Sequence, residues 1–411
     1  MHGIGVTCGL AAGVWLGSAE APTKLVNVGI SPVTVSLAMV IGVFVGRWTL
    51  PTLLKGTTYV FSDLATRPHL IVWGVLAGAL WAVANTMTIF AIRDVGLAIA
   101  FPLWNANSLI GLFWGWLLFH EMRGAGLRVG SRVVGGALGI VAGTILLAFA
   151  TLQHTNGAPA RAVHGVVAAL GASLLWGTMY VPYRKAYVSG LNPLSFLTVF
   201  SFGELGTMAL LASTFGGGMT QLHAELHTAR HIVFWIFLGG FCWVIGDIFQ
   251  QYATKYVGIG RGIPLANTNQ LWGLAWGALV FGELVHVSAG GRWLIVAGSV
   301  LMILSVSAIS SAAAPEREQA SGHQAISREC ERYGLDLAGR SASGHGADAK
   351  SGRRWWDGVI VASAVSVFLW LGLQAQVPPL AINAFWTSVL GVLLVCVAMG
   401  CGWLLWKRRF E

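Results

Sequence analysis

Residues 81–121 read WAVANTMTIFAIRDVGLAIAFPLWNANSLIGLFWGWLLFHE, and residues 243–283 read WVIGDIFQQYATKYVGIGRGIPLANTNQLWGLAWGALVFGE. Shifted by 162 positions, the two stretches align without a gap and share 16 of 41 residues. Apolar composition alone does not produce ungapped agreement at proline, asparagine and glutamate, so the chain contains an internal duplication. The shared polar and helix-breaking pairs are Pro102/Pro264, Asn105/Asn267, Asn107/Asn269 and Glu121/Glu283.

The duplication extends outward on both sides of this stretch. Upstream, Trp15 lies 161 positions before Trp176. Downstream, the sequence IVAG occurs at 140–143 and again at 295–298, an offset of 155. The repeated unit therefore includes more than the two helices that first reveal it.

Composition places the chain in a membrane. Of its 411 residues 55% are hydrophobic and 10% are charged, which is too apolar for a soluble protein. A helix needs about 20 apolar residues to cross a hydrocarbon core of ~30 Å, and helices satisfy their own backbone hydrogen bonds there. Twelve apolar runs approach this length, at 3–20, 33–52, 70–92, 97–119, 132–152, 164–183, 193–214, 232–252, 259–281, 293–312, 356–376 and 384–406.

Five of these runs make one repeat. Because five is an odd number, the second copy enters the membrane from the opposite side, which predicts an inverted repeat around an axis in the membrane plane. The expected fold is an all-α polytopic membrane protein with a 5+5 inverted repeat and two extra C-terminal helices. The expected domains are a first repeat at 1–152, a second at 153–312, a flexible cytoplasmic linker at 313–354 and a two-helix extension at 355–411.

The positions of the basic residues predict the orientation. With the N-terminus inside, 20 of the 25 Lys and Arg residues, Arg47 among them, fall on the cytoplasmic side. Both termini are therefore expected inside. A net charge of +9 distributed in this way does not form the clustered face that nucleic acid binding needs.

Several short patterns resemble the drug/metabolite transporter superfamily. They are Trp176-Gly177-x4-Pro182, Leu80-Trp81-Ala82 with Asn85, Gly96-x5-Pro102, and the Phe-x-Glu endings at Glu121 and Glu283. Within the superfamily the chain looks most like the glucose/ribose porter family and, more distantly, rhamnose/proton symporters, over residues 1–312. This resemblance implies a ten-helix inverted repeat and sugar uptake coupled to a cation, with the proton as first choice. The chain departs from the family's pattern in two places. Trp15-Leu16-Gly17 interrupts the Trp-Gly pair, and two extra helices follow at the C-terminal end.

The prolines and amides of the repeated stretch predict a substrate site. Pro102 and Pro264 each leave a backbone carbonyl without its helical donor, which is tolerated at membrane depth where the carbonyl lines a cavity. Amide side chains both donate and accept, as sugar hydroxyls require. The alternative is that these amides only hold helices together. The candidates are Asn85, Asn105, Asn107, Asn267, Asn269 and Gln270.

Tryptophan rings can stack on the apolar face of a sugar, although most of the 19 tryptophans are expected to pack or to anchor the chain at the interface. Trp81, Trp176 and Trp243 are the candidates for binding because they lie inside the repeated patterns.

Two carboxylates in apolar runs predict ion coupling. Glu204 lies midway along the run at 193–214 and Asp247 lies inside the run at 232–252. Burying such a group costs about 2.5–3.5 kcal/mol on insertion scales, so a functional role is the default expectation. The alternative is a structural ion pair, for which the candidate partners are Arg184, Lys185 and Arg261.

Other functions fit less well. The chain has no Gly-x4-Gly-Lys-Ser/Thr loop for ATP. A membrane-embedded enzyme would need convergent acids or a nucleophile near one interface, so no enzyme and no cofactor are predicted. A scaffold, or export of metabolites or drugs on the same fold, remains open. His223, His227 and His231 favour an amphipathic surface segment over a metal site.

The sequence thus predicts a secondary transporter in the cytoplasmic membrane of a bacterium. Its expected partners are a monosaccharide, a proton or other cation, and the lipid bilayer. A homodimer is also considered, because Gly135, Gly139 and Gly143 can serve either internal helix packing or a dimer face.

Overall fold

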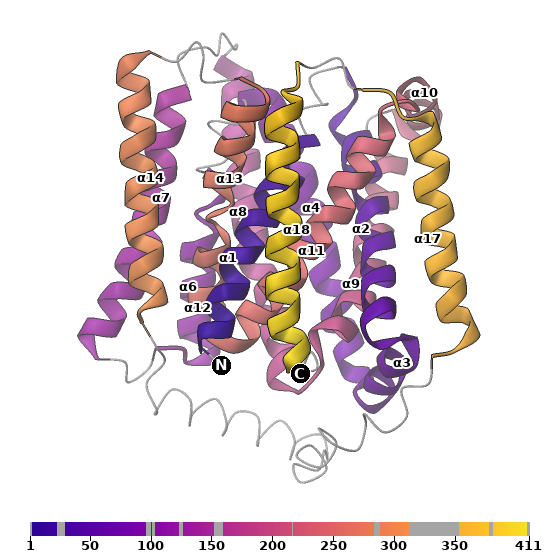
Figure 1. The fold of residues 1–411 in the computed structure, drawn as a ribbon, viewed down its shortest axis with the longest axis horizontal. Helices are drawn as coiled ribbons and strands as arrows, with labels where there is room; N and C mark the ends of the chain where they lie inside the picture. The colour runs from indigo at the N-terminus through magenta and orange to yellow at the C-terminus, as the bar shows by residue number, and fades with distance from the viewer. Residues whose placement is uncertain are drawn as a thin grey trace.

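The computed structural model describes residues 2–22, 29–95, 100, 103–122, 126–151, 159–215, 217–282, 288–312, 353–377 and 381–408. Within these ranges all regular elements are helical. The first half contains α1 (His2–Ala19), α2 (Pro32–Lys55), α3 (Thr57–Thr66), the short η2 (Pro68–Leu70), α4 (Ile71–Val95), α6 (Asn107–Phe119) and α7 (Leu127–Thr151) (Figure 1).

The second half follows the same order of elements. It contains α8 (Pro159–Val188), α9 (Pro193–Thr214), α10 (Gly218–Ala229), α11 (Val233–Val257), α12 (Ile259–Ala266), α13 (Asn269–Ala275), the π-helical turn η4 (Trp276–Val280) and α14 (Ala289–Ser310). Two further helices, α17 (Trp355–Gln374) and α18 (Ala384–Lys407), complete the described chain.

Among the described residues, nine helices are long and apolar enough to cross a membrane. The chain is therefore a polytopic membrane protein, as predicted. The other predicted runs correspond to α1, which has 18 residues, to the shorter α6, and to the interrupted segment α12–α13–η4. Pro264 lies inside α12, and Asn267 and Thr268 separate α12 from α13. A proline removes a helical donor, and asparagine competes for backbone groups, so the run at 259–281 does not form one straight helix.

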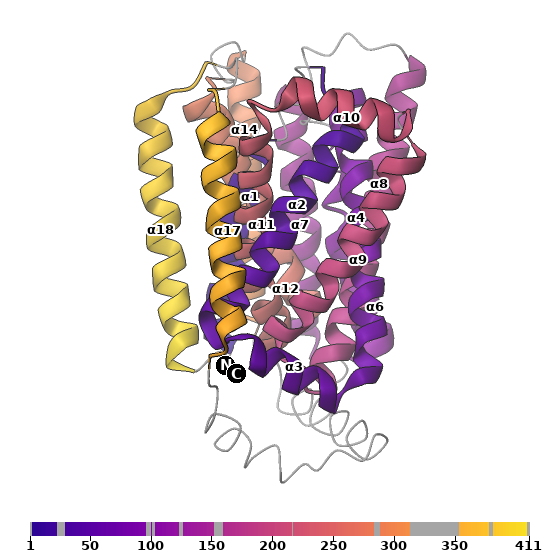
Figure 2. The same cartoon turned by 90° about the vertical axis from the view of Figure 1, so that its right-hand side faces the viewer.

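Two helices begin in the same way at opposite ends of the molecule. Ser31 caps α2 by accepting the amide of Thr34, and Asn192 caps α9 by accepting the amide of Leu194. In each helix a proline occupies the first position, where its missing N–H has no intrahelical partner to lose. From these starts α2 runs to α3 and α9 runs to α10, and Figure 2 shows α3 and α10 at opposite ends.

The helices pack as two groups. The first group comprises α1, α2, α11 and the segment α12–η4, and the second group comprises α4, α6, α8 and α9. Inside the first group α1 packs along α11 and α11 packs along α2; inside the second group α8 packs along α4 and α4 along α9. The two groups meet where α2 contacts α9 and α4 and where α12 contacts α6, and α7 and α14 pair with each other beside them (Figures 1 and 2).

Glycines set the closest helix approaches. A Cβ atom at Gly42 would lie 2.0 Å from the backbone oxygen of Phe237, so α2 and α11 touch through their backbones. A Cβ atom at Gly203 would lie 2.1 Å from the backbone oxygen of Val75, which places α9 equally close to α4. Small residues of this kind are what membrane helices use to approach closely.

Two of the three α7 glycines considered above, Gly139 and Gly143, pack inside the molecule. A Cβ at Gly139 would lie 2.1 Å from Ser305 Oγ, and one at Gly143 would lie 2.6 Å from Met302 Cγ, so α7 uses this face to pack on α14. A Cβ at Gly135 would have no neighbour within 4 Å among the described residues, apart from the backbone of its own helix.

The C-terminal helices attach to the first group at both ends of the molecule. At one end Trp356 donates its indole N–H to the hydroxyl of Thr57 at 2.6 Å, and Asp357 accepts the Thr57 amide at 3.1 Å. At the other end the amide of Gln376 donates to the backbone oxygen of His231 at 2.8 Å. The predicted linker lies outside the described residues apart from its end at 353–354.

Candidate functional site

A buried arginine joins the two carboxylates singled out above. Arg47 of α2 lies 3.0 Å from Glu204 through Nε and 3.0 Å from Asp247 through Nη2, and all three side chains are at most 1% exposed. A second contact, Arg47 Nη2 to Glu204 Oε1, measures 3.3 Å. Arg47 and Asp247 belong to the first helix group and Glu204 to the second. The cluster therefore bridges the two groups.

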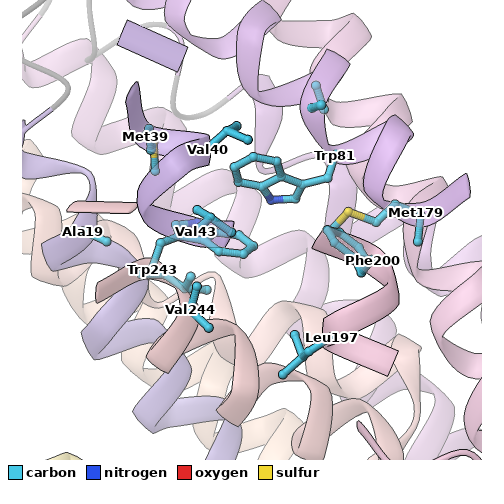
Figure 3. Close-up of a cluster of buried hydrophobic side chains, with 14 of the residues drawn as sticks. Ala19, Met39, Val40, Val43, Trp81, Met179, Leu197, Phe200, Trp243 and Val244 are labelled. Atoms are coloured by element: carbon cyan, nitrogen blue, oxygen red, sulfur yellow. The ribbon is translucent and has the colours of Figure 1, made fainter. Parts of the chain in front are cut away.

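Aromatic rings enclose this cluster. The Arg47 guanidinium lies 4.0 Å from the ring centre of Phe200 and 5.6 Å from that of Trp243, as cation–π contacts require. Trp243 meets Trp81 edge to face with 4.8 Å between ring centres, and Figure 3 shows the two indoles side by side among apolar side chains. The rings exclude water, which strengthens the electrostatic interactions inside.

The arginine that pairs with both carboxylates is Arg47, which is not among the candidate partners given above. The charge count places Arg47 on the cytoplasmic side, yet it is fully buried in α2. Arg184 instead lies 3.4 Å from Glu121, and Arg261 donates to the backbone oxygen of Val257 at 3.5 Å. The signal for Arg47 was present in the sequence, because it is the charged residue inside the apolar run at 33–52.

A polar chain leads from Asp247 along α11. Gln251 Nε2 donates to Asp247 Oδ2 at 2.8 Å, and the Tyr187 hydroxyl donates to Gln251 Oε1. Gln250 donates to the Tyr180 hydroxyl one residue earlier in α11. All of these side chains are buried, so each needs the partner that it has.

The amides of the helix breaks form a second cluster. Asn267 Nδ2 lies 2.8 Å from Asn107 Oδ1, 2.6 Å from Ser108 Oγ and 3.3 Å from the backbone oxygen of Asn105. This cluster joins the break before α13 to the start of α6. In this conformation Asn267 holds the two breaks together, which is the role considered above as the alternative.

The remaining predicted amides lie apart from that cluster. Asn85 donates to Ser36 Oγ at 2.9 Å, and Gln270 Nε2 lies 3.4 Å from Asn269 Oδ1. Pro264 is buried in α12, whereas Pro102 lies outside the described residues.

Three buried indole groups donate to no acceptor among the described residues. They belong to Trp15, Trp81 and Trp176. Trp176 also meets Trp104 edge to face with 5.9 Å between ring centres. A buried donor without an acceptor costs roughly 1–3 kcal/mol. Trp81 and Trp176 are among the predicted binding residues, and Trp15 is not.

Glu121, which ends the repeated stretch, caps a helix. Its Oε1 accepts the amide of Ile259 at 3.0 Å and its Oε2 accepts that of Gly260 at 2.9 Å, at the start of α12. The preceding Gly258 has φ +83°, a conformation that favours glycine and turns the chain into α12. The repeated Phe-x-Glu pattern thus has a structural role in its first copy, whereas Glu283 lies outside the described residues.

Replacing Glu121 by Gln is expected to lower the free energy of unfolding by about 1–2 kcal/mol, because the start of α12 loses its anion and one amide loses its acceptor. Thermal unfolding of the purified protein in detergent measures this change. An unchanged unfolding temperature would show that Glu121 does not stabilise α12.

No cluster of three or more metal-binding side chains occurs among the described residues. His223 and His227 lie on α10, where both side chains are exposed.

Comparison with known proteins relates the chain to membrane transporters. Residues 163–310 match the EamA-like transporter family. The chain is 24% identical over 247 residues, 59% of this chain and 80% of the relative, to a Streptococcus pyogenes serotype M6 protein whose name assigns it to sugar uptake. It is 23% identical over 226 residues, 54% of this chain and 71% of the relative, to a glucose uptake protein of Staphylococcus xylosus.

A Listeria innocua protein, also named for sugar uptake, is 24% identical over 194 residues, which cover 46% of this chain and 62% of the relative. One solved structure covers 72% of this chain and 94% of its own at a TM-score of 0.48 and 18% identity, too distant to assign a function. The match over residues 163–310 confirms the predicted resemblance to the drug/metabolite transporter superfamily, and together with the apolar helices of the described residues it supports a multi-pass bacterial membrane protein.

Proposed function

We propose that the chain takes up a monosaccharide together with a proton, by alternating access on a 5+5 inverted repeat. The observation that carries this proposal is the single Arg47 shared between Glu204 and Asp247. With both carboxylates ionised, the buried cluster has one negative charge in excess. An unpaired charge at membrane depth is costly, so the cluster favours binding one further cation.

Binding a cation there would change the attraction between the two helix groups. Glu204 reaches Arg47 across the group boundary, whereas Asp247 reaches it from the same group. A proton on Glu204 would weaken the contact across the boundary and leave the one inside the first group intact. This is the link between ion binding and movement that a coupled carrier needs.

Equivalent contacts support the inverted repeat. The close approach of Gly42 to Phe237 and of Gly240 to Met39 corresponds, at offsets of 161 and 162, to that of Gly203 to Val75 and of Gly78 to Phe200. The hydrogen bond from Trp114 to Thr178 likewise corresponds to that from Trp276 to Ser18. The first and second groups are then two copies of one packing unit, and exchange of their conformations would open opposite faces.

The sugar assignment rests on the indoles and on the relatives. Trp15 and Trp176 correspond to each other in the duplicated sequence, and each buries an indole N–H that has no acceptor in the part of the chain that the structure describes. Sugar hydroxyls accept such hydrogen bonds, and a sugar ring can stack on Trp81 or Trp243. Amides of the breaks, including Asn107 and Asn269, would join the site when the breaks separate. The two uptake proteins of S. pyogenes and S. xylosus are named for the same class of substrate.

Uptake into proteoliposomes tests the proposal. Labelled glucose, ribose and rhamnose are offered with and without an imposed pH gradient, to the unchanged protein and to Glu204→Gln and Asp247→Asn. The unchanged protein is expected to show saturable uptake that the gradient accelerates. Glu204→Gln is expected to keep sugar exchange but to lose the response to the gradient, because glutamine still accepts from Arg47 but cannot take up and release a proton.

Glu121→Gln is the matched control, since Glu121 is a buried carboxylate outside the Arg47 cluster. Its uptake should still respond to the gradient. Gradient-driven uptake that persists in both Glu204→Gln and Asp247→Asn would exclude these two groups as proton carriers. Absence of uptake of any sugar by folded protein would refute the sugar assignment and leave export or another metabolite.

A further inference from the structure

A glutamate of the α10 surface helix ties down the start of α2. Glu225 Oε2 accepts the Ser31 amide at 3.3 Å, the Ser31 hydroxyl at 2.6 Å and the Thr34 hydroxyl at 2.5 Å. Partial burial acts against the charged form, but these hydrogen bonds outweigh it and hold the pKa of Glu225 below its ordinary value. The contact joins α10, which follows α9 of the second group, to α2 of the first.

An aspartate of α3 ties down the start of α9 at the opposite face. Asp63 Oδ2 accepts the Asn192 amide at 3.0 Å, and Asp63 Oδ1 lies 2.6 Å from Arg67 Nη1. Arg67 Nε also donates to the backbone oxygen of Ser189 at 3.2 Å, in the turn before α9. Burial raises the pKa of Asp63, and the Asn192 amide and Arg67 offset only part of that effect. This contact joins α3, which follows α2 of the first group, to α9 of the second.

The two contacts are equivalent in the duplicated sequence. Asp63 lies 162 positions before Glu225, and Ser31 lies 161 positions before Asn192. Each carboxylate accepts the amide of the residue that caps the other group's helix. The Asp63 contact lies at the face that carries both termini, and the Glu225 contact lies at the other face (Figures 1 and 2).

We propose that Asp63 and Glu225 are paired latches that close the two faces of the transporter, and that one latch releases while the other holds. This inference rests on the alternating access proposed above. The groups contact each other where α2 crosses α9, at Arg47 and Glu204, while the close glycine contacts hold α2 on α11 and α9 on α4, so that each group is packed as a unit. A rocking motion about that crossing separates the groups at one face and presses them together at the other. A hydrogen bond between the groups at a face must therefore break when that face opens.

The latches also explain why a carboxylate is used at each face. A carboxylate accepts several donors at the positive end of a helix, and water can replace those donors at the surface when the contact opens. The hydrogen bonds of each latch thus favour the closed state of its face, yet they can break when that face opens.

Hydrogen exchange of backbone amides tests the proposal without a sugar or a pH gradient, so its result is independent of the uptake assay. The purified protein is measured in lipid nanodiscs over residues 29–36 and 189–196, the starts of α2 and α9. Losing a cap shifts a local equilibrium by a factor of about five. Glu225→Gln is therefore expected to accelerate exchange at 29–36 about fivefold and, by favouring closure of the opposite face, to slow exchange at 189–196.

Asp63→Asn is expected to give the mirror result, and the double variant is expected to bring the ratio of the two rates back toward that of the unchanged protein. Gln221→Ala is the matched control. Gln221 donates to the other oxygen of Glu225 at 3.0 Å from within α10 and joins no groups, so its loss should leave 189–196 unchanged.

A second variant tests the effect of locking one latch instead of releasing it. A disulfide between cysteines introduced by Ser31→Cys and Glu225→Cys holds one latch shut, and is expected to accelerate exchange at 189–196 until it is reduced. If each single variant accelerates exchange only at its own helix start, and the disulfide has no effect at the opposite face, the two contacts are independent helix caps and the proposal is wrong.

Discussion

Replacing Arg47 by Met is expected to destabilise the protein by about 3–5 kcal/mol, because it leaves Glu204 and Asp247 facing each other without their shared cation. Both carboxylates are at most 1% exposed, so water cannot take the place of the guanidinium. Phe200 and Trp243 would also lose the charge that lies over their rings. Thermal unfolding in nanodiscs, followed by tryptophan fluorescence, measures the loss.

Removing the two negative charges should reverse most of this loss. The triple variant Arg47→Met, Glu204→Gln, Asp247→Asn is expected to unfold close to the temperature of the unchanged protein, because replacing a whole buried charge cluster is often neutral. It should nevertheless show no response to a pH gradient. If Arg47→Met alone unfolds at the temperature of the unchanged protein, the carboxylates do not depend on Arg47, and the charge argument for coupling fails with it.

The second large effect is expected at Gly203, beside Glu204 on α9. Gly203→Ala would place a Cβ atom 2.1 Å from the backbone oxygen of Val75, and backbone cannot move aside as the end of a side chain can. The resulting separation of α4 and α9 is expected to cost about 1–3 kcal/mol and to displace Glu204 from Arg47. Uptake that depends on the pH gradient should fall together with stability.

Gly206 offers a matched control on the same helix, three residues further on. Among the described residues, no atom beyond the backbone of its own helix lies within 4 Å of a Cβ placed there, and alanine is favoured over glycine inside a helix by roughly 0.5–1 kcal/mol. Gly206→Ala is therefore expected to unfold at the same temperature or slightly above it, and to keep full uptake. Equal unfolding temperatures for the two variants would contradict the close approach of α9 to α4.

Much of the fold follows from the sequence because membrane helices are specified by length and apolarity. The long apolar runs at 33–52 and 193–214 became α2 and α9, and the prolines and amides at 259–281 correctly indicated an interrupted helix. The duplication was visible in the ungapped match. These features depend on local composition, which a single sequence displays directly.

The partners of the site residues could not be read in the same way. Glu204 and Asp247 were selected because a carboxylate in an apolar run is costly, and the same reasoning applied to Arg47 would have included it. The charge count instead places Arg47 on the cytoplasmic side. Asp63 and Glu225 are not among the predicted site residues, because their partners at the starts of α9 and α2 include the backbone amides of Asn192 and Ser31, which have no signature in a sequence. Asp63 corresponds to Glu225 at an offset of 162, and Ser31 corresponds to Asn192 at an offset of 161. Only the packing of α3 and α10, however, shows that each carboxylate contacts the start of the other group's helix.

The C-terminal extension makes the two helix groups unequal in mass. The principal contacts of α17 are with α2 and α11, and those of α18 are with α1 and η4, so both helices enlarge the first group. Their outer faces carry large apolar side chains, among them Leu373 at 88% exposure, which lipid surrounds. The larger group therefore meets more resistance to movement from the bilayer. Relative to the membrane, the second group would move, and the first group, with its two added helices, would stay nearly still.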